Sequence, residues 1–535
     1  MYEPKNITLW QMLCETASKY PDNEAAVSLD MRLKYSELIT KCEELAGAFL
    51  NAGIVKGDHV GLWLNDGPKT VLLMCSLWCI GAVPVPICTD FMQRELEGCI
   101  KSADIGYLIT DIVHRDNDLL KVCLEQTALA HDRIFTAEES GCEAFASVDS
   151  LLRAGSVSQE EIRAAEESVQ PSDIDTILFT SGSTGSAKPV LTTHFSRVNT
   201  AYAQAAALDT TPQDRFCSVL PMFHCFSLTG TILASLAAGA CLCYPPSRKT
   251  TEILATVERE HCTVLTAVPT LFSALVRRQK EIAADVSTLR TGMIGGSTYP
   301  PEFFCEICDV FGMTLLPSLG QTEATAGISS GLLTDSIELR STSLGVPFEG
   351  TELSIRTDGK ALLPDGQVGE ICVRGFNVMQ GYYNNPQATA HAIGEDGWLH
   401  TDDLGYMKDG YLYYSGRLKD IIIRGGENIF PGEIETLLES DERISQTKVI
   451  GVPDPHDIEE VCACIVPAEG RSVDADYVRN IVAASLSAYK VPRYVVFFSS
   501  FPLMGTGKID RRTLKSEVTE MLLGSKNATD SAESK

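Results

Sequence analysis

Apolar and polar positions alternate with two different periods along most of this chain. A helical period predicts amphipathic helices over segments such as 35–52, 251–261 and 301–311. Short apolar runs rich in β-branched residues, such as 60–64 and 264–267, predict buried strands between the helices. Because helices and strands follow one another in turn, we expect an α/β fold with largely parallel sheets.

The pattern changes twice toward the C-terminus. From about Gly345, short strands and tight turns predict a small β-subdomain at the end of the large α/β region. Beyond Arg417, residues 421–515 carry strands and helices of their own, which is enough chain for a small α+β domain. The polar, small-residue segment 524–535 predicts a disordered tail.

Length and charge narrow the classes of function. A chain of 535 residues exceeds what one hydrophobic core usually supports, which agrees with several domains. Its 44 basic and 71 acidic residues give a net charge of 44 − 71 = −27. A chain with this negative charge repels nucleic acids and anionic lipids, and we therefore expect no nucleic-acid partner. Any phosphate that the protein binds must be held by a local site.

Eighteen cysteines raise the question of disulfides or a metal site. The first residues show no secretory signal, so we predict a cytoplasmic protein with reduced, mostly buried cysteines. Cys305 and Cys308 form one CxxC pair inside a predicted helix, which favours packing over metal binding. The apolar run 71–87 is interrupted by glycine and proline and predicts a buried helix followed by a short strand, with no membrane span.

Segment 180–188, with the sequence TSGSTGSAK, combines hydroxyl side chains, two glycines and a lysine. Glycines let backbone amides approach an anion, hydroxyls donate hydrogen bonds and lysine adds charge, so the segment predicts a phosphate cradle. It does not fit a Walker A motif, and predicted strands at 177–180 and 190–193 flank it, so we expect a loop between two strands. A flexible Ser/Gly turn without a ligand is the alternative.

Five more segments with polar, charged and glycine residues follow this loop, at 321–323, 397–405, 414–420, 425–435 and 505–511. Each by itself is typical of a protein surface. In this order, the set resembles the motifs of the adenylate-forming superfamily, which includes acyl- and aryl-CoA synthetases, the adenylation domains of nonribosomal peptide synthetases and firefly luciferase. The resemblance runs from about residue 9 to about residue 514.

The resemblance implies a site for ATP and Mg²⁺. The loop 180–188 would hold the β- and γ-phosphates, Thr322 would contact the α-phosphate, and Glu323 would bind Mg²⁺. Asp402 would accept hydrogen bonds from the ribose hydroxyls, and Arg417 would contact ribose and phosphate. The positions implied to bind ATP or coenzyme A are Thr180, Ser181, Gly182, Ser183, Thr184, Gly185, Lys188, Gly295, Gly296, Ser297, Ser318, Leu319, Gly320, Gln321, Thr322, Asp402, Arg417, Lys419, Gly425, Gly426 and Glu427.

Lys508 matches the catalytic lysine of the superfamily. A substrate carboxylate must approach an anionic α-phosphate, and a positioned ammonium reduces their repulsion as charge builds up in the transition state. The resemblance further implies an AMP-binding domain over 1–416, a hinge at 417–420 and a mobile C-terminal domain over 421–523. Rotation at the hinge would withdraw Lys508 and present the loop 425–427 to a thiol.

The chain departs from the superfamily pattern at two places. Leu319 stands where an aromatic residue commonly stacks on adenine, so packing on the purine is retained without the π contribution. Ala187 and Pro189 replace the usual proline and glycine on either side of Lys188. Neither change removes a hydroxyl, an early glycine or the lysine of the phosphate loop, so we expect phosphate binding to persist.

The resemblance also indicates the class of acid, through the residue at position 224, which is histidine here. Amino-acid-activating relatives place an aspartate there to pair with the substrate ammonium, and a neutral imidazole offers no such ion pair. His224 is a candidate catalytic residue together with Thr322 and Lys508, although a pocket-wall role is favoured for it. The predicted pocket walls are mostly apolar or small and suit a fatty or aryl acid: Phe226, Thr229, Ala267, Val268, Gly295, Ala326 and Gly327.

The leading hypothesis is therefore an acid–thiol ligase that forms an acyl-adenylate from a carboxylic acid and ATP and transfers the acyl group to coenzyme A. Two alternatives stay open: an acyl-AMP ligase that loads a carrier-protein phosphopantetheine, and a non-catalytic nucleotide-binding protein on the same fold. The expected partners are the acid, ATP and coenzyme A, with a carrier protein and a second copy of the chain, as a homodimer, as further candidates.

Overall fold

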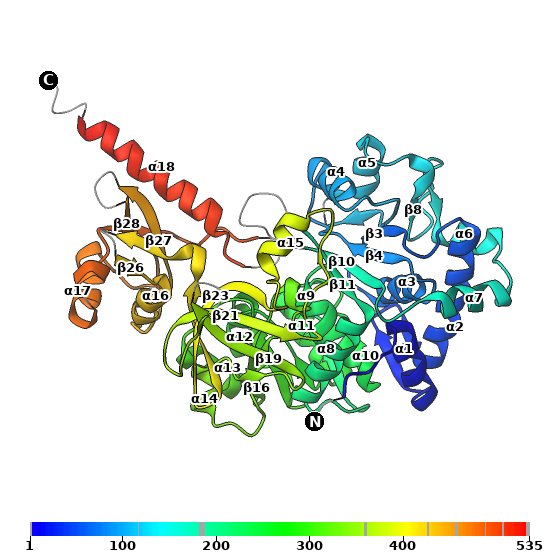
Figure 1. The fold of residues 1–535 in the computed structure, drawn as a ribbon, viewed down its shortest axis with the longest axis horizontal. Helices are drawn as coiled ribbons and strands as arrows, with labels where there is room; N and C mark the ends of the chain where they lie inside the picture. The colour runs from blue at the N-terminus through cyan, green and yellow to red at the C-terminus, as the bar shows by residue number, and fades with distance from the viewer. Residues whose placement is uncertain are drawn as a thin grey trace.

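The computed structural model shows a large α/β region and a smaller C-terminal part that stands to one side of it (Figure 1). The described residues are 3–115, 117–180, 188–357, 361–424, 427–454, 458–486, 488–504 and 508–530. Helix α18 (Arg511–Asp530) projects from the C-terminal part and continues into segment 524–535, for which the sequence predicts disorder.

A five-stranded, fully parallel sheet lies in the N-terminal third of the chain, in the order β4-β3-β5-β8-β9. Its strands are β3 (His59–Trp63), β4 (Val83–Pro86), β5 (Tyr107–Thr110), β8 (Ile134–Thr136) and β9 (Ala146–Ser147). The helices of this part are α1 (Leu9–Lys19), α2 (Tyr35–Asn51), α3 (Pro68–Cys79), α4 (Gln93–Ser102), α5 (Leu119–Glu125), α6 (Val148–Ala154) and α7 (Gln159–Ser168).

A nine-stranded sheet forms the centre of the molecule, in the order β18-β17-β16-β15-β14-β12-β13-β1-β2. Its six middle strands are parallel: β16 (Thr314–Leu319), β15 (Thr291–Gly295), β14 (Val264–Leu265), β12 (Arg215–Cys217), β13 (Cys241–Cys243) and β1 (Glu24–Val27). The antiparallel edges are β17 (Ser329–Ser330), β18 (Val346–Pro347) and β2 (Arg32–Lys34). The carboxyl ends of β15 and β16 lie side by side, which is where ligands bind in open α/β sheets.

The helices between residues 194 and 342 connect the strands of this central sheet. They are α8 (His194–Ala207), α9 (Cys225–Ser227), a π-helix (Leu228–Leu233), α10 (Ala234–Ala238), α11 (Thr250–Glu260), α12 (Pro269–Ile282), α13 (Pro301–Phe311) and α14 (Ile337–Thr342). One continuous core cluster extends from α1 to residue Ala326 and packs these helices on the sheet.

Two smaller sheets complete the large region. In the first, β10 (Ile174–Thr180), β11 (Lys188–Thr193) and β22 (Gly381–Tyr382) are antiparallel. The second is the β-subdomain expected after residue 345, with β20 (Ala361–Leu362), β19 (Thr351–Thr357), β21 (Gly369–Gly375), β23 (Leu399–Lys408) and β24 (Tyr411–Arg417) in that order. Helix α15 (Pro386–Ala392) lies between β22 and β23 in sequence.

The C-terminal part has its own sheet and its own apolar clusters. The sheet contains β25 (Ile422–Arg424), β26 (Glu427–Ile429), β27 (Ile444–Asp454), β28 (Ile458–Pro467) and β29 (Tyr494–Phe497). One cluster packs beneath α16 (Pro431–Glu439) and α17 (Ala475–Ser485), and another packs beneath α18. Each side of the sheet is therefore covered by helix.

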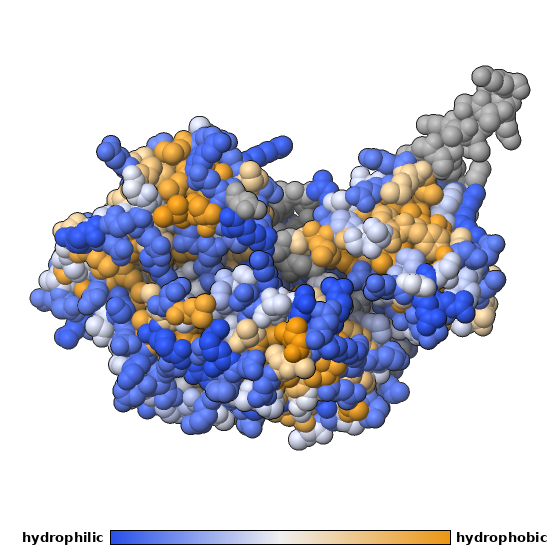
Figure 2. All heavy atoms as spheres, turned by 180° about the vertical axis from the view of Figure 1, so that it is seen from behind, coloured by the Kyte–Doolittle hydropathy of each residue, from blue (hydrophilic) through white to orange (hydrophobic). Residues whose placement is uncertain are grey.

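The predicted α/β class is confirmed, and so are most of the elements read from periodicity. The helix expected over 301–311 is α13, with the same bounds, and 35–52 is α2 with one residue fewer. The apolar run 71–87 lies in α3 and β4 and is fully buried. Among the described residues, no helix is long and apolar enough to cross a membrane, and Figure 2 shows apolar patches interrupted by hydrophilic side chains on one face.

Candidate functional site

The expected phosphate loop connects the two strands of a hairpin. Thr180 at the end of β10 pairs with Lys188 at the start of β11, so the prediction of a loop between two strands is confirmed. The loop residues Ser181, Gly182, Ser183, Thr184 and Gly185 lie outside the described residues. Lys188 directs its Nζ toward the ring of Tyr382, 4.8 Å from the ring centre.

Tyr382 connects this lysine to the proposed Mg²⁺ carboxylate. Its hydroxyl donates a 2.8 Å hydrogen bond to Glu323 Oε1, and the backbone N–H of Met379 donates to the Glu323 carbonyl at 2.9 Å. Burial, reinforced by Glu323, raises the pKa of Tyr382, so the phenol stays protonated and remains a donor. Tyr382 therefore contacts Glu323 through its hydroxyl and Lys188 through its ring.

The residues implied to bind adenine, 295–297 and 318–320, lie at the ends of β15 and β16 and just beyond them. Gly295 pairs with Ser318, and a Cβ on Gly295 would lie 2.6 Å from the carbonyl oxygen of Ser318. Gly320 is equally constrained, because its Cβ would lie 2.3 Å from the carbonyl oxygen of Ala326. These two glycines are required by close backbone approach and keep the chain ends free of side chains.

The other residues expected in the adenine pocket differ in exposure and in hydrogen bonding. Ser297 is exposed and donates to the Thr298 carbonyl at 3.2 Å. The amide nitrogen of Gln321 is buried without a hydrogen-bond partner among the described residues. Leu319 packs on the apolar cluster of the β-subdomain, so its contact surface is aliphatic, as the sequence indicates.

Asp402 and Arg417 lie on the paired strands β23 and β24. Asp402 has a left-handed backbone with φ of 58° and an exposed side chain. The Arg417 Nε donates to Asp403 Oδ1 at 2.9 Å, and this buried carboxylate raises the pKa of Arg417. The sequence singled out Asp402 but not Asp403, which anchors the arginine.

Lys508 lies inside the large region although it belongs to the C-terminal part. Its Cε is 3.0 Å, and its Nζ 3.5 Å, from the position that a Cβ on Gly296 would occupy. Burial lowers the pKa of Lys508, while Cys225 and Asp403 act in the opposite direction. The structure thus brings Lys508 close to the end of β15. The carboxylates of Glu323 and Asp403 are near enough to act on its charge.

His224 lies at the start of the short helix α9 and accepts a 3.2 Å hydrogen bond from the Phe226 backbone N–H at Nδ1. Burial, with a smaller contribution from Lys508, lowers the pKa of His224 to about 3. The imidazole is therefore neutral at physiological pH, with Nδ1 committed as an acceptor. Next to it, the Thr322 hydroxyl donates to Cys225 Sγ at 3.6 Å, which joins Thr322 to the same helix.

The walls expected for the acid pocket are buried and mostly apolar. Phe226 lies beside the end of β15, with its Cζ 3.7 Å from the position of a Cβ on Gly295. Val268 Cγ1 is 3.5 Å from that of Gly296. Thr229 accepts a 2.9 Å hydrogen bond from the buried Arg197, which orients its hydroxyl.

The segment in which the sequence predicts a hinge contains a 3₁₀ turn, Leu418–Asp420. Arg511 donates to Asp420 at 2.8 Å and to Glu435 at 2.7 Å, which connects α18 and α16 to this turn. The side chain of Lys419 lies outside the described residues, and so do Gly425, Gly426 and the side chain of Glu427.

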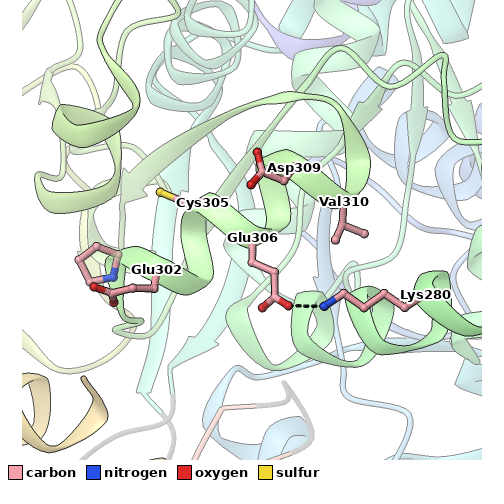
Figure 3. Close-up of a pocket in the computed structure, with 7 residues that line it drawn as sticks. Lys280, Glu302, Cys305, Glu306, Asp309 and Val310 are labelled. Atoms are coloured by element: carbon pink, nitrogen blue, oxygen red, sulfur yellow. Dashed lines mark hydrogen bonds and ion pairs between the residues drawn. The ribbon is translucent and has the colours of Figure 1, made fainter. Parts of the chain in front are cut away.

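A surface hollow of about 560 Å³ lies between α12 and α13, away from this site (Figure 3). An ion pair of 2.6 Å between Lys280 and Glu306 closes one side of it. Its wall includes Cys305, whereas Cys308 is buried in the main core. The structure describes all eighteen cysteines and each is free, in agreement with packing as the role of most of them.

Comparisons with known proteins show the family of the chain. A model of AMP-binding enzymes matches residues 13–383, and a model of the AMP-binding enzyme C-terminal domain matches residues 433–508. The chain is 34% identical to the putative acyl-CoA synthetase YngI of Bacillus subtilis, over 97% of this chain and 99% of that protein. It is 31% identical to the mitochondrial medium-chain acyl-CoA ligase ACSF2 of Bos taurus, over 97% and 88% of the two chains.

Among solved structures, ATP-bound MatB from Rhodopseudomonas palustris has a similar fold. The TM-score is 0.86 at 23% identity, over 97% of this chain and 100% of that chain. At this level of identity the likeness concerns the fold alone.

Proposed function

Because the chain belongs to the AMP-binding enzyme family, we propose that it activates a carboxylic acid with ATP and passes the acyl group to coenzyme A. In the first step a carboxylate oxygen attacks the α-phosphorus, and pyrophosphate leaves with the electrons of the broken P–O bond. In the second step the thiol sulfur attacks the acyl carbon, and AMP leaves. Relatives named acyl-CoA synthetase and acyl-CoA ligase, matched over nearly their whole length, support this proposal.

The position of Lys508 carries the proposal. Its side chain approaches Gly296 at the end of β15, and Val268 of the expected acid pocket lies beside the same glycine. A cation at this place reduces repulsion between the incoming carboxylate and the α-phosphate and stabilises charge on the phosphoryl oxygens. The neutral His224 adds no competing charge and forms the wall beside the reacting carboxylate.

The roles proposed for the nucleotide site are those that the resemblance to the superfamily implies. The hairpin loop 180–188 would bind the β- and γ-phosphates, Thr322 the α-phosphate, and the ends of β15 and β16 the adenine. Asp402 and Arg417 would hold the ribose. Glu323 fits Mg²⁺ because it offers one oriented carboxylate, and the ion keeps most of its ligands for phosphate and water. Mg²⁺ supplies charge neutralisation of the phosphates.

The transfer of the acyl group to the thiol needs a different face of the C-terminal part at the same site. We propose the division into 1–416, a hinge at 417–420 and a mobile domain over 421–523, with Lys419 at the hinge. Rotation would withdraw Lys508 and bring Gly425, Gly426 and Glu427 to the thiol. The separate apolar clusters of the C-terminal sheet support rotation as a unit.

The acid is proposed to be a fatty or aryl acid. The walls near Phe226 and Val268 are apolar, and the neutral imidazole of His224 offers no partner for the ammonium of an amino acid. One named relative acts on medium-chain acids, which makes medium-chain fatty acids the first to test.

Carboxylate-dependent exchange of pyrophosphate into ATP tests the proposal. A panel of medium- and long-chain fatty, aryl and amino acids is offered with and without coenzyme A, and AMP release and thioester are measured. Exchange with an apolar acid, and thioester only when coenzyme A is present, is the expected result. Transfer to a purified carrier protein but not to coenzyme A would assign the other acceptor, and no exchange with any acid would contradict the proposal.

A homodimer and a cytoplasmic location are also proposals. Sedimentation of the purified chain tests the first. Fractionation of expressing cells tests the second, which is of interest because the bovine relative is named as mitochondrial.

A further inference from the structure

Asp402 lies in an irregular stretch of strand β23. Glu370 of β21 pairs with Leu404, and Cys372 pairs with His400, so β23 advances by four residues where β21 advances by two. The two additional residues form a bulge centred on Asp402, which has a left-handed backbone with φ of 58°. This conformation is unfavourable for a residue with a side chain, so neighbouring groups must stabilise it.

Glu370 provides that stabilisation from the opposite strand. Its Oε1 accepts a 3.2 Å hydrogen bond from the backbone N–H of Asp402, and its Oε2 lies 2.8 Å from His400 Nδ1. Thr401 completes the bulge: its hydroxyl donates to the Ile371 carbonyl at 2.7 Å and accepts from the Asp403 N–H at 3.1 Å. Both oxygens of the Glu370 carboxylate are therefore engaged, one of them on the backbone of Asp402.

The two aspartates at the bulge point in different directions. Asp402 is exposed, whereas Asp403 is buried and bonded to Arg417. Adjacent side chains alternate between faces in a regular strand too, so the specific effect of the bulge is the left-handed backbone at Asp402. The hydrogen bond from the Asp402 N–H to Glu370 Oε1 holds that backbone and, with it, the base of the exposed side chain.

We propose that Glu370 is a positioning residue of the nucleotide site. It holds the backbone of Asp402 so that the carboxylate of Asp402 faces both ribose hydroxyls of ATP, and His400 orients Glu370 from the other side. This inference rests on the proposed function, because it takes Asp402 as the residue that binds the ribose.

The same cluster contains the ligand types of a metal site, since atoms of Glu370, Cys372 and His400 lie within 4.8 Å of one another. The contacts are explained without an ion. Burial raises the pKa of the Cys372 thiol to about 12, so it stays protonated, 3.5 Å from His400 Nδ1. The Glu370 carboxylate already has a backbone donor and a histidine as partners.

The test compares ATP with 2′,3′-dideoxy-ATP in the pyrophosphate-exchange assay. The measured quantity is the ratio of kcat/KM for the two nucleotides, which reports the interaction with the ribose hydroxyls. We expect Glu370→Ala to reduce this ratio about tenfold, mostly through the KM for ATP, as Asp402→Ala does. Glu370→Gln should keep most of the ratio, because its amide oxygen can still accept from Asp402. Glu352→Ala is the control, since Glu352 is an exposed acid of the same sheet that pairs with Arg374.

The outcomes distinguish the ribose-binding role of Asp402 from the positioning role of Glu370. If Asp402→Ala leaves the ratio unchanged, the assignment of Asp402 to the ribose is wrong. If Asp402→Ala lowers the ratio and Glu370→Ala does not, the positioning role is wrong while the proposed function stands. Should Glu370→Ala fail to fold, Glu370→Asp decides, because it keeps the charge but shortens the reach. An unchanged ratio in that variant also overturns the positioning role.

Discussion

Lys508 and Gly296 lie in contact although they come from different parts of the molecule. The Cε of the lysine is 3.0 Å from the place of a Cβ on residue 296, and Gly296 has a φ of 88°. Any side chain at position 296 would therefore meet the aliphatic stem of Lys508. Because glycine has no side chain, Lys508 can lie against the backbone at the end of β15.

Gly296→Ala is expected to reduce pyrophosphate exchange about tenfold or more, because the added methyl group displaces Lys508. The positive φ adds a folding cost of about 1–2 kcal/mol. Gly366→Ala is a matched control, since Gly366 has a φ of 83° and its Cβ would meet no described atom within 4 Å. Equal losses of activity in both variants would show that backbone strain, and not the contact with Lys508, is responsible.

Tyr382→Phe is expected to weaken activation by Mg²⁺, because the phenol donor orients the Glu323 carboxylate. Loss of such a supporting hydrogen bond raises the Mg²⁺ concentration for half-maximal exchange about tenfold. Tyr383→Phe is the control, because that hydroxyl bonds Asp104 at 2.9 Å, away from Glu323. An unchanged Mg²⁺ dependence in Tyr382→Phe would argue against the assignment of Glu323 to the metal.

The pH dependence of exchange is expected to show an alkaline limb set by Lys508. Burial lowers the pKa of Lys508, and adenylation needs its charged form. The rate therefore falls as pH rises through a value below the ordinary lysine pKa of about 10.4. The measurement is kcat/KM against pH, which reports the free enzyme. The arginine of Lys508→Arg stays charged over this pH range, so the fall in kcat/KM at high pH should disappear in that variant. The same fall in Lys508→Arg would show that another group is responsible.

A buried ion pair supports the wall of the acid pocket. Arg197 and Asp175 are fully shielded from solvent, 2.5 Å apart, and Arg197 also donates to Thr229. Arg197→Met leaves the Asp175 charge unpaired and is expected to destabilise the fold by about 3–5 kcal/mol, measured by urea unfolding. Arg153→Met, at the exposed pair with Glu139, should leave the midpoint unchanged. A similar midpoint for both variants would show that the buried pair contributes little.

Periodicity predicts individual elements of this fold well but not their neighbours. Helix α13 and the hairpin around the phosphate loop follow from local pattern and turn residues. The order of the central sheet does not, because β12 pairs with β13 and β14 through contacts between distant segments. The π-helix Leu228–Leu233 is also invisible to pattern, since all of its residues are buried.

The candidate site shows the same division. Motif residues such as Glu323 and Asp402 follow from the sequence, whereas the groups that are hydrogen-bonded to them do not. Tyr382 lies 59 residues from Glu323, and Glu370 lies 32 residues from Asp402. Their hydrogen bonds depend on strand register and on a bulge, which a single sequence does not reveal.

The most direct test of the account is the Lys508→Ala variant, assayed separately in the two half-reactions. Exchange of pyrophosphate into ATP should fall a hundredfold or more. Thioester formation from synthetic acyl-adenylate and coenzyme A should stay close to that of the wild-type enzyme, because the proposed rotation withdraws Lys508 in that step. Lys515→Ala, an exposed lysine of α18 paired with Glu459, is the control. Wild-type exchange in Lys508→Ala would contradict the account.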